Sequence, residues 1–132
     1  MPSHQDQNVE NAQAAQKTIL LVEDDAAIAE LLVQMITQET IHRVFGVTDG
    51  PQALAFVRDI KPHLLILDYR LPTMHGIELY DRLHTTEGFE RIPTIMISAN
   101  VPQNEIKRRQ IMFMRKPFDI YALLEAIQRL LM

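Results

Sequence analysis

The sequence contains no cysteine, which excludes a disulfide framework and thiolate metal ligands. No apolar run approaches the roughly 20 residues that a membrane-spanning helix requires. The N-terminus lacks the basic-then-apolar order of a signal peptide. A formal net charge of -4 gives no general attraction to nucleic acid. We therefore expect a cytoplasmic, single-domain protein that contacts neither membranes nor nucleic acid directly.

The first 16 residues differ in composition from the rest of the chain. Residues 1–16 (MPSHQDQNVENAQAAQ) are polar and have almost no large apolar side chains. This composition is typical of a mobile tail, with a short docked helix as the alternative. From Lys17 onward, apolar runs alternate with helical patterns. We therefore expect a polar tail over residues 1–16 and one folded domain over residues 17–132.

Short apolar runs and amphipathic segments alternate through this domain. Five runs predict β-strands over residues 18–22, 42–47, 63–68, 94–98 and 111–114. Helical patterns follow Asp25 and cover residues 48–60, 76–84, 102–110 and 119–131. In the first helix the expected buried face consists of Ile28, Leu31, Leu32, Met35 and Ile36. Strands that are apolar throughout indicate a doubly wound α/β fold, with a parallel sheet covered by helices on both faces.

Polar residues collect where these strands end. Glu23 and Asp24 follow the first strand, Asp68 ends the third, Ser98 ends the fourth and Lys116 follows the fifth. The carboxyl ends of the strands are where such sheets bind ligands. Three carboxylates suit a hard cation such as Mg²⁺. A carboxylate that attacks phosphorus also needs a cation for the phosphoryl oxygens and a hydroxyl donor, and both types of group are present.

Each acidic group also has a purely structural interpretation. The acids of EDD (residues 23–25) suit a helix N-terminus, and Asp25 is expected to serve mainly in that way. Asp68 suits a turn at the end of a strand. The order of the other polar groups along the chain favours the chemical interpretation for Asp68.

Four motifs occur in order: LLVEDD (residues 20–25), LLILDYRLPTMHGIEL (64–79), TIMISAN (94–100) and MRKPF (114–118). Together they resemble the receiver domain of two-component response regulators. The resemblance extends from about Lys17 to Leu131, nearly the whole chain beyond the tail. It implies a flavodoxin-like sheet with strand order 2-1-3-4-5.

The resemblance implies roles for the acidic residues and their neighbours. Asp68 would accept the phosphoryl group. Asp24, Asp68 and the backbone carbonyl of Arg70 would bind Mg²⁺, and Glu23 would assist through water. The side chains of Arg70 and Asn100 would tune the lifetime of the phosphoryl group.

The resemblance also implies roles for residues on the last two strands. Lys116 would contact the phosphoryl group and matter more for the response than for the fold. Ser98 would supply the switch hydroxyl and Phe113 the switch aromatic ring. The Lys116–Pro117 peptide bond is expected to be cis, which is a minority state.

The region between Ser98 and Lys116 departs from the family. It is shorter than usual by about four residues, or roughly one helical turn. We expect a fourth helix of two turns or fewer that starts near Pro102 and is more mobile than the first and fifth helices. A tight crossover also favours exchange of the last strand and helix between two chains, which is one route to a homodimer and a minority outcome. The basic residues 107–109 are expected to form a solvated face.

The leading functional hypothesis is a phosphorylation-controlled signalling switch rather than an enzyme. Asp68 would receive its phosphoryl group from a histidine kinase or a histidine phosphotransfer protein, and binding of an unknown downstream partner would change. One alternative is a pseudo-receiver that binds partners without phosphate. A haloacid dehalogenase-type phosphohydrolase is disfavoured, because its nucleophile follows the first strand and is followed two residues later by a second acid, where this chain has Arg70.

Overall fold

The computed structural model describes residues 16–100 and 102–132. The expected polar tail therefore lies outside the described residues, apart from Gln16. The side-chain amide of Gln16 donates a hydrogen bond to the carbonyl oxygen of Ile41 over 3.1 Å. Among the described residues, no helix combines the length and the apolar character that crossing a bilayer requires.

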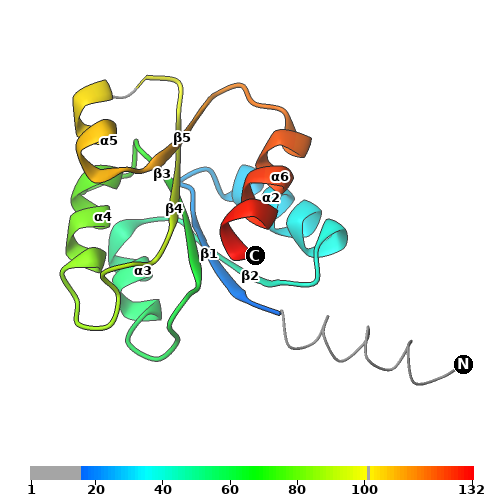
Figure 1. Ribbon diagram of the computed structural model, residues 1–132, viewed down its shortest axis with the longest axis horizontal. Coiled ribbons are helices and arrows are strands. Elements are labelled where there is room, and N and C mark those ends of the chain that lie inside the picture. The colour runs from blue at the N-terminus through cyan, green and yellow to red at the C-terminus, as the bar shows by residue number, and fades with distance from the viewer. Residues whose placement is uncertain (1–15, 101) are drawn as a thin grey trace, which may run out of the picture.

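A single parallel sheet forms the centre of the molecule (Figure 1). Its strands are β1 (Thr18–Val22), β2 (Arg43–Val47), β3 (Leu64–Asp68), β4 (Thr94–Ser98) and β5 (Met112–Arg115). They lie in the order β2-β1-β3-β4-β5, and every neighbouring pair is parallel. The expected fold class and strand order are confirmed.

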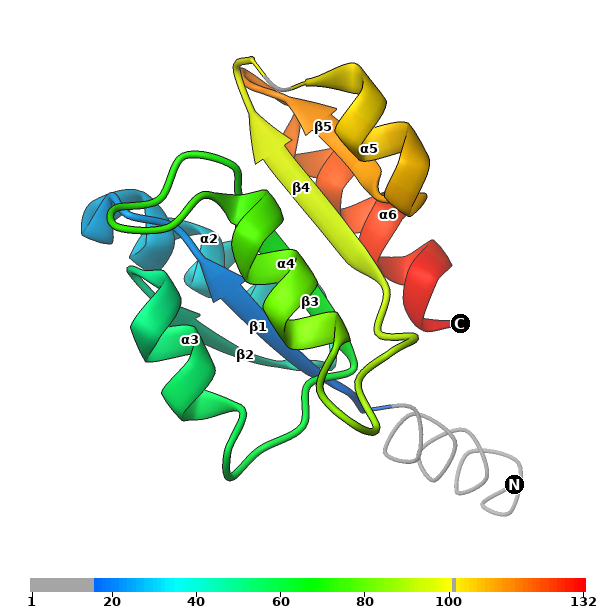
Figure 2. The same cartoon turned by 90° about the vertical axis from the view of Figure 1, so that its left-hand side faces the viewer.

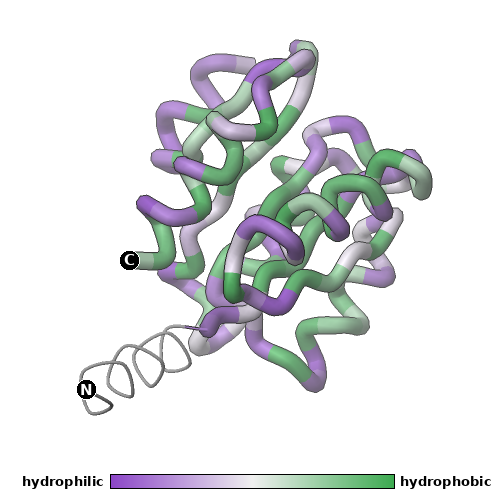
Figure 3. The backbone as a smooth tube through the Cα atoms, turned by 90° about the vertical axis from the view of Figure 1, so that its right-hand side faces the viewer, coloured by the Kyte–Doolittle hydropathy of each residue, from purple (hydrophilic) through white to green (hydrophobic). Residues whose placement is uncertain are grey.

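Helices cover both faces of this sheet. They are α2 (Ala26–Glu39), α3 (Gly50–Phe56), α4 (Gly76–His84), α5 (Gln103–Arg109) and α6 (Ile120–Leu131). Figures 1 and 2 show α3, α4 and α5 on one face of the sheet and α2 and α6 on the other. Figure 3 shows the α2–α6 side, where hydrophobic and hydrophilic stretches alternate along the helices. Each helical layer buries its apolar side against the strands, so the sheet has a separate hydrophobic core on each face.

Aspartate side chains cap the N-termini of three of the described helices, α2, α3 and α6. The Oδ1 atom of Asp25 accepts hydrogen bonds from the backbone N–H groups of Ala27 and Ile28, over 3.0 and 3.1 Å. Asp119 caps α6 in the same way by accepting from the N–H of Tyr121. Such caps satisfy N–H groups that have no partner within the helix. Because Asp25 starts α2 at once, the two preceding acids stay at the end of β1.

Two expectations about burial are only partly confirmed. The buried positions of α2 are Ala29, Leu32 and Ile36, whereas Ile28 and Leu31 are exposed. The expected face and the observed face both have helical spacing. The observed face includes the small residue Ala29, which is buried with Leu32 and Ile36. Residues 111–114 were expected to be buried, yet only Ile111, directly before β5, is buried. The residues of β5 itself are partly buried or exposed. The reason is that β5 is an edge strand, with a neighbour on one side only.

Two helices, α3 and α5, are shorter than α4, which lies on the same face of the sheet. The segment 48–60 was expected to be helical, but α3 ends at Phe56. Helix α5 has seven residues, which is about two turns. It begins directly after Pro102 and ends at Arg109, and the φ of 58° at the C-cap residue Gln110 lies in the left-handed region. The expected short fourth helix is confirmed, while its mobility and the exchange of the last strand between chains stay predictions.

Candidate functional site

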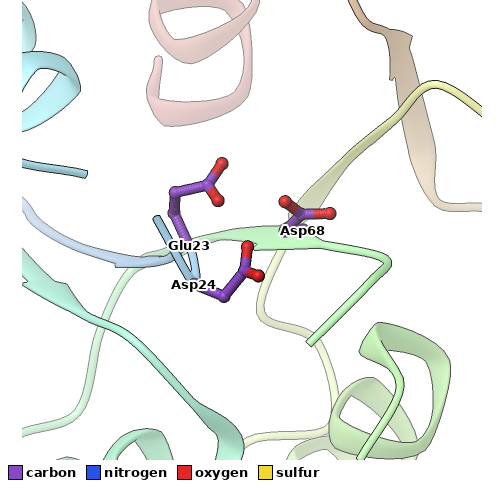
Figure 4. A group of neighbouring side chains, drawn as sticks. All are labelled: Glu23, Asp24 and Asp68. Atoms are coloured by element: carbon purple, nitrogen blue, oxygen red, sulfur yellow. The ribbon is translucent and has the colours of Figure 1, made fainter. Parts of the chain in front are cut away.

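Three carboxylates meet at the carboxyl edge of the sheet. Glu23 and Asp24 directly follow β1, and Asp68 is the last residue of the neighbouring strand β3. One carboxylate oxygen from each residue lies within 4.8 Å of the other two (Figure 4). Glu23 and Asp68 are buried, whereas Asp24 is exposed. The cluster is therefore anchored in the core and open to solvent on the side of Asp24.

The chemistry of this donor set fits one class of cation. All three groups offer carboxylate oxygen, which is the ligand that Mg²⁺ prefers in proteins. Mg²⁺ also keeps several water molecules and often shares a phosphate, so a site that is open on one side suits it. The expected metal ligands Asp24 and Asp68 and the expected water-mediated ligand Glu23 are thus brought together.

Lys116 lies between the two buried carboxylates. Its Nζ atom is 2.9 Å from Oδ2 of Asp68 and 3.0 Å from Oε1 of Glu23. The backbone N–H of Lys116 donates to the carbonyl oxygen of Ser98, and the following peptide bond to Pro117 is cis, the state that the resemblance implies. Sequence reasoning placed Lys116 beside Asp68 but missed its second bond, because nothing local connects residues 93 positions apart.

Burial and charge together determine the protonation of this cluster. Burial raises the pKa of Glu23 to about 7, although hydrogen bonds from the N–H of Asp25 and from Lys116 oppose the shift. Burial by itself would lower the pKa of Lys116, but its hydrogen bonds to Asp68 and Glu23 raise the pKa above the ordinary value. Near neutral pH the cluster therefore holds a cationic lysine and a glutamate that readily binds or releases a proton.

The turn after β3 folds back onto Asp68. Oδ1 of Asp68 accepts a hydrogen bond from the backbone N–H of Arg70 over 2.9 Å. The N–H of Gly76 donates to the carbonyl oxygen of Tyr69 over 2.7 Å. A Cβ atom at position 76 would lie 2.5 Å from the carbonyl oxygen of Asp68, so this approach requires glycine. The first turn of α4 is thereby held directly against the backbone of Asp68.

Ser98 reaches the same edge from β4, but its hydroxyl is occupied. The Oγ atom donates to the carbonyl oxygen of Asn100 over 3.0 Å and accepts from the N–H of Asn100 over 3.2 Å. Phe113 lies on β5 and packs partly buried against the core on the α3–α5 side of the sheet. The side chains of Arg70 and Asn100 are exposed, and both residues lie directly beyond the strands that carry Asp68 and Ser98.

Comparison with known proteins agrees with this geometry. Residues 19–128 match the response regulator receiver domain family. The DNA-binding response regulator MtrA of Mycobacterium tuberculosis is 38% identical over 81 residues, which are 61% of this chain and 34% of that protein. Sporulation initiation phosphotransferase F of Bacillus subtilis is 31% identical over 117 residues, covering 86% of this chain and 92% of that one. The chain thus spans about a third of the length of MtrA but nearly all of the second relative.

A solved structure gives the same result. The receiver domain of the sensor histidine kinase PA1611 from Pseudomonas aeruginosa PAO1, described with a magnesium ion in its active-site cleft, superposes with a TM-score of 0.75. The identity is 26%, and the match covers 88% of this chain and 98% of the other. Fold, acidic edge and sequence match lead to the same conclusion: this chain belongs to the family of response regulator receiver domains.

Proposed function

We propose that the chain is a phosphorylation-controlled signalling switch whose phosphoacceptor is Asp68. Receiver domains of two-component systems interact with histidine kinases or phosphotransfer proteins, and the donor proposed here is a phosphohistidine of such a protein. The observation that carries the proposal is the contact between Lys116 and Asp68 inside the carboxylate cluster. In this contact the ammonium group of Lys116 lies beside the carboxylate of Asp68, at the carboxyl edge of the sheet.

The proposed reaction transfers one phosphoryl group. An oxygen of Asp68 attacks phosphorus, the phosphorus–nitrogen bond to the donor imidazole breaks, and the imidazole leaves as a neutral ring once protonated. The product is an acyl phosphate on Asp68. Lys116 then pairs with the phosphoryl oxygens and offsets their charge. Ser98 supplies the hydroxyl that hydrogen-bonds the new group.

A divalent cation completes this site. Asp24 and Asp68 would hold Mg²⁺ directly, together with the carbonyl oxygen of Arg70, and Glu23 would hold it through water. When bound, Mg²⁺ neutralises negative charge on the phosphoryl oxygens during transfer. Arg70 lies two residues after Asp68 and Asn100 two residues after Ser98, and we assign their exposed side chains to tuning the lifetime of the phosphoryl group.

The test is covalent labelling of the wild-type protein. Incubation with acetyl phosphate and Mg²⁺ is expected to add the mass of one phosphoryl group, and hydroxylamine should remove it because acyl phosphates are cleaved by that nucleophile. Absence of the mass gain would favour the pseudo-receiver, which binds partners without phosphate. Addition to a serine or threonine would leave a hydroxylamine-resistant product and would contradict the assignment to a carboxylate.

The exposed acid of the cluster gives a prediction about the metal. Replacing Asp24 with Asn should weaken Mg²⁺ binding by about tenfold or more, because the metal loses a charged ligand. Isothermal titration measures the affinity. The matched control is Asp25→Asn, which removes the neighbouring charge while asparagine still caps α2. Equal affinities in the two variants would remove Asp24 from the metal site.

The raised pKa of Glu23 predicts that Mg²⁺ binding depends on pH. In the metal-free protein Glu23 holds a proton up to about pH 7, so the stabilisation linked to this proton is lost as the pH rises through that value. A cation favours the ionised form, so its affinity should increase between about pH 5.5 and about pH 8.5. Titrations across this interval measure the effect. In the Glu23→Gln variant the affinity for Mg²⁺ should change much less with pH than in the wild type. An equally steep pH dependence in the variant would show that another group is responsible.

A further inference from the structure

An arginine joins the short helix α5 to its neighbour α4. The Nε and Nη2 atoms of Arg109 lie 2.7 and 2.8 Å from the two carboxylate oxygens of Asp81 on α4. Its Nη1 atom lies 2.7 Å from Oε2 of Glu105, one turn earlier on α5. Only 16% of the Arg109 side chain is exposed. Bidentate, charge-assisted pairs of this kind are among the strong hydrogen bonds between side chains, and here the arginine end is shielded from water while 47% of the Asp81 side chain is exposed.

Helix α5 has little else to hold it in place. Within its seven described residues, burial is limited to Ile106, and Pro102 at its start offers no side-chain cap. The hydroxyl of Tyr80 on α4 adds one hydrogen bond to the carbonyl oxygen of Arg109 over 3.2 Å. The hydrogen bond from Arg109 lowers the pKa of Asp81, which agrees with an ion pair that forms in the folded state. The position of α5 therefore depends strongly on Arg109.

The other end of α5 leads to the phosphorylation edge. The hydroxyl of Ser98 donates to the carbonyl oxygen of Asn100, two residues before α5 is entered through Pro102. To donate to a phosphoryl oxygen on Asp68, this hydroxyl must give up its bond to the carbonyl oxygen of Asn100, so one contact between the site and the residues that precede α5 is lost. Helix α4 is anchored directly on the site, because the N–H of Gly76 in its first turn is bonded to the carbonyl oxygen of Tyr69, next to Asp68. Arg109 thus connects a helix whose contact with the site changes to a helix that is anchored on the site.

We infer that Arg109 is a positioning residue of the switch, which holds α5 in its unphosphorylated place through Asp81. The inference rests on the proposed phosphorylation of Asp68. The bridge stabilises the resting arrangement more than the phosphorylated one, so it opposes the transition. A ligand that favours the second arrangement must supply this difference in free energy, and its apparent affinity rises when the bridge is removed.

The experiment compares Arg109→Gln with Arg108→Gln. Arg108 is the adjacent residue, its side chain is 67% exposed, and its ion pair is with Glu105 on the same helix. The probe is beryllofluoride with Mg²⁺, a tetrahedral mimic of a phosphoryl group on a carboxylate. Arg109→Gln is expected to bind it about fivefold or more tightly than the wild type, and Arg108→Gln within about twofold of the wild type. Asp81→Asn should match Arg109→Gln, and the double variant should show no further gain.

The outcomes separate the inference from the proposed function. A purely structural bridge would lower the midpoint of urea unfolding in Arg109→Gln and leave the beryllofluoride affinity unchanged, which would overturn the inference alone. If that variant does not fold, Asp81→Asn decides the question by the same measurement. A wild-type protein that fails to bind beryllofluoride would overturn the proposed function and this inference with it.

Discussion

Replacing Asp68 with Asn is expected to abolish the acyl phosphate while the protein stays folded. The carboxylate oxygen is the proposed nucleophile, and an amide at the same place is too weak a nucleophile to replace it. The folded structure retains most contacts, because the amide oxygen still accepts from the N–H of Arg70 or from Lys116. The substitution also removes one carboxyl group from a cluster of three, which repel one another wherever they are ionised. The free energy of unfolding without metal is therefore expected to stay within about 1 kcal/mol of the wild type or to increase.

Two measurements check this result. Intact-mass spectrometry after treatment with acetyl phosphate and Mg²⁺ reports the acyl phosphate, and urea unfolding reports stability. The control is Asp59→Asn, which changes an exposed aspartate that precedes β3, whereas Asp68 is the last residue of that strand. Phosphorylation that persists in the Asp68 variant would show that another residue is the acceptor. A loss of stability above about 2 kcal/mol would show that Asp68 is chiefly structural.

Replacing Lys116 with Met is the second change with a large expected effect. The variant should be less stable than the wild type by about 2 kcal/mol in the absence of Mg²⁺, since two buried carboxylates lose their shared cation. Removing one partner of a fully buried pair costs about 3–5 kcal/mol, and the 31% exposure of Lys116 reduces the expected value. Methionine keeps the length of the side chain, so the loss of charge dominates the change.

Magnesium should offset part of this loss. A bound divalent cation supplies the positive charge that Lys116 no longer provides, so urea unfolding with and without Mg²⁺ should differ more in the variant than in the wild type. The control is Lys107→Met, which removes an exposed lysine from α5. If Mg²⁺ stabilises the Lys116 variant no more than the wild type, the charge of Lys116 is not balancing the carboxylates. From the sequence, Lys116 was expected to matter mainly for the response to phosphorylation. Its second hydrogen bond, to Glu23, is the reason why we also expect it to stabilise the folded protein.

Local sequence patterns predicted most of the scaffold. Two strands, Thr18–Val22 and Thr94–Ser98, were predicted with their observed bounds. Each is a short apolar run between polar residues, a pattern that is visible in adjacent positions of the sequence. The acids at the strand ends were predicted to meet for a related reason: the carboxyl ends of parallel strands lie at one edge. The boundaries of β5 and α3 were less accurate, since edge position and helix termination depend on neighbouring elements.

The sequence by itself determined the sheet, the short α5 and the meeting of Glu23, Asp24 and Asp68 at one edge. The strands follow from apolar runs, and the meeting of the acids follows from the order of the elements. The strand order and the short α5 follow from the resemblance to receiver domains, in which the region between Ser98 and Lys116 is usually longer. Only the tertiary structure decided that Lys116 is shared between two acids and that Arg109 reaches Asp81, 28 residues earlier. Such pairs depend on the distance and rotation at which packed elements face each other. Those quantities are determined by how core side chains fill the space between the elements, and no local pattern records them.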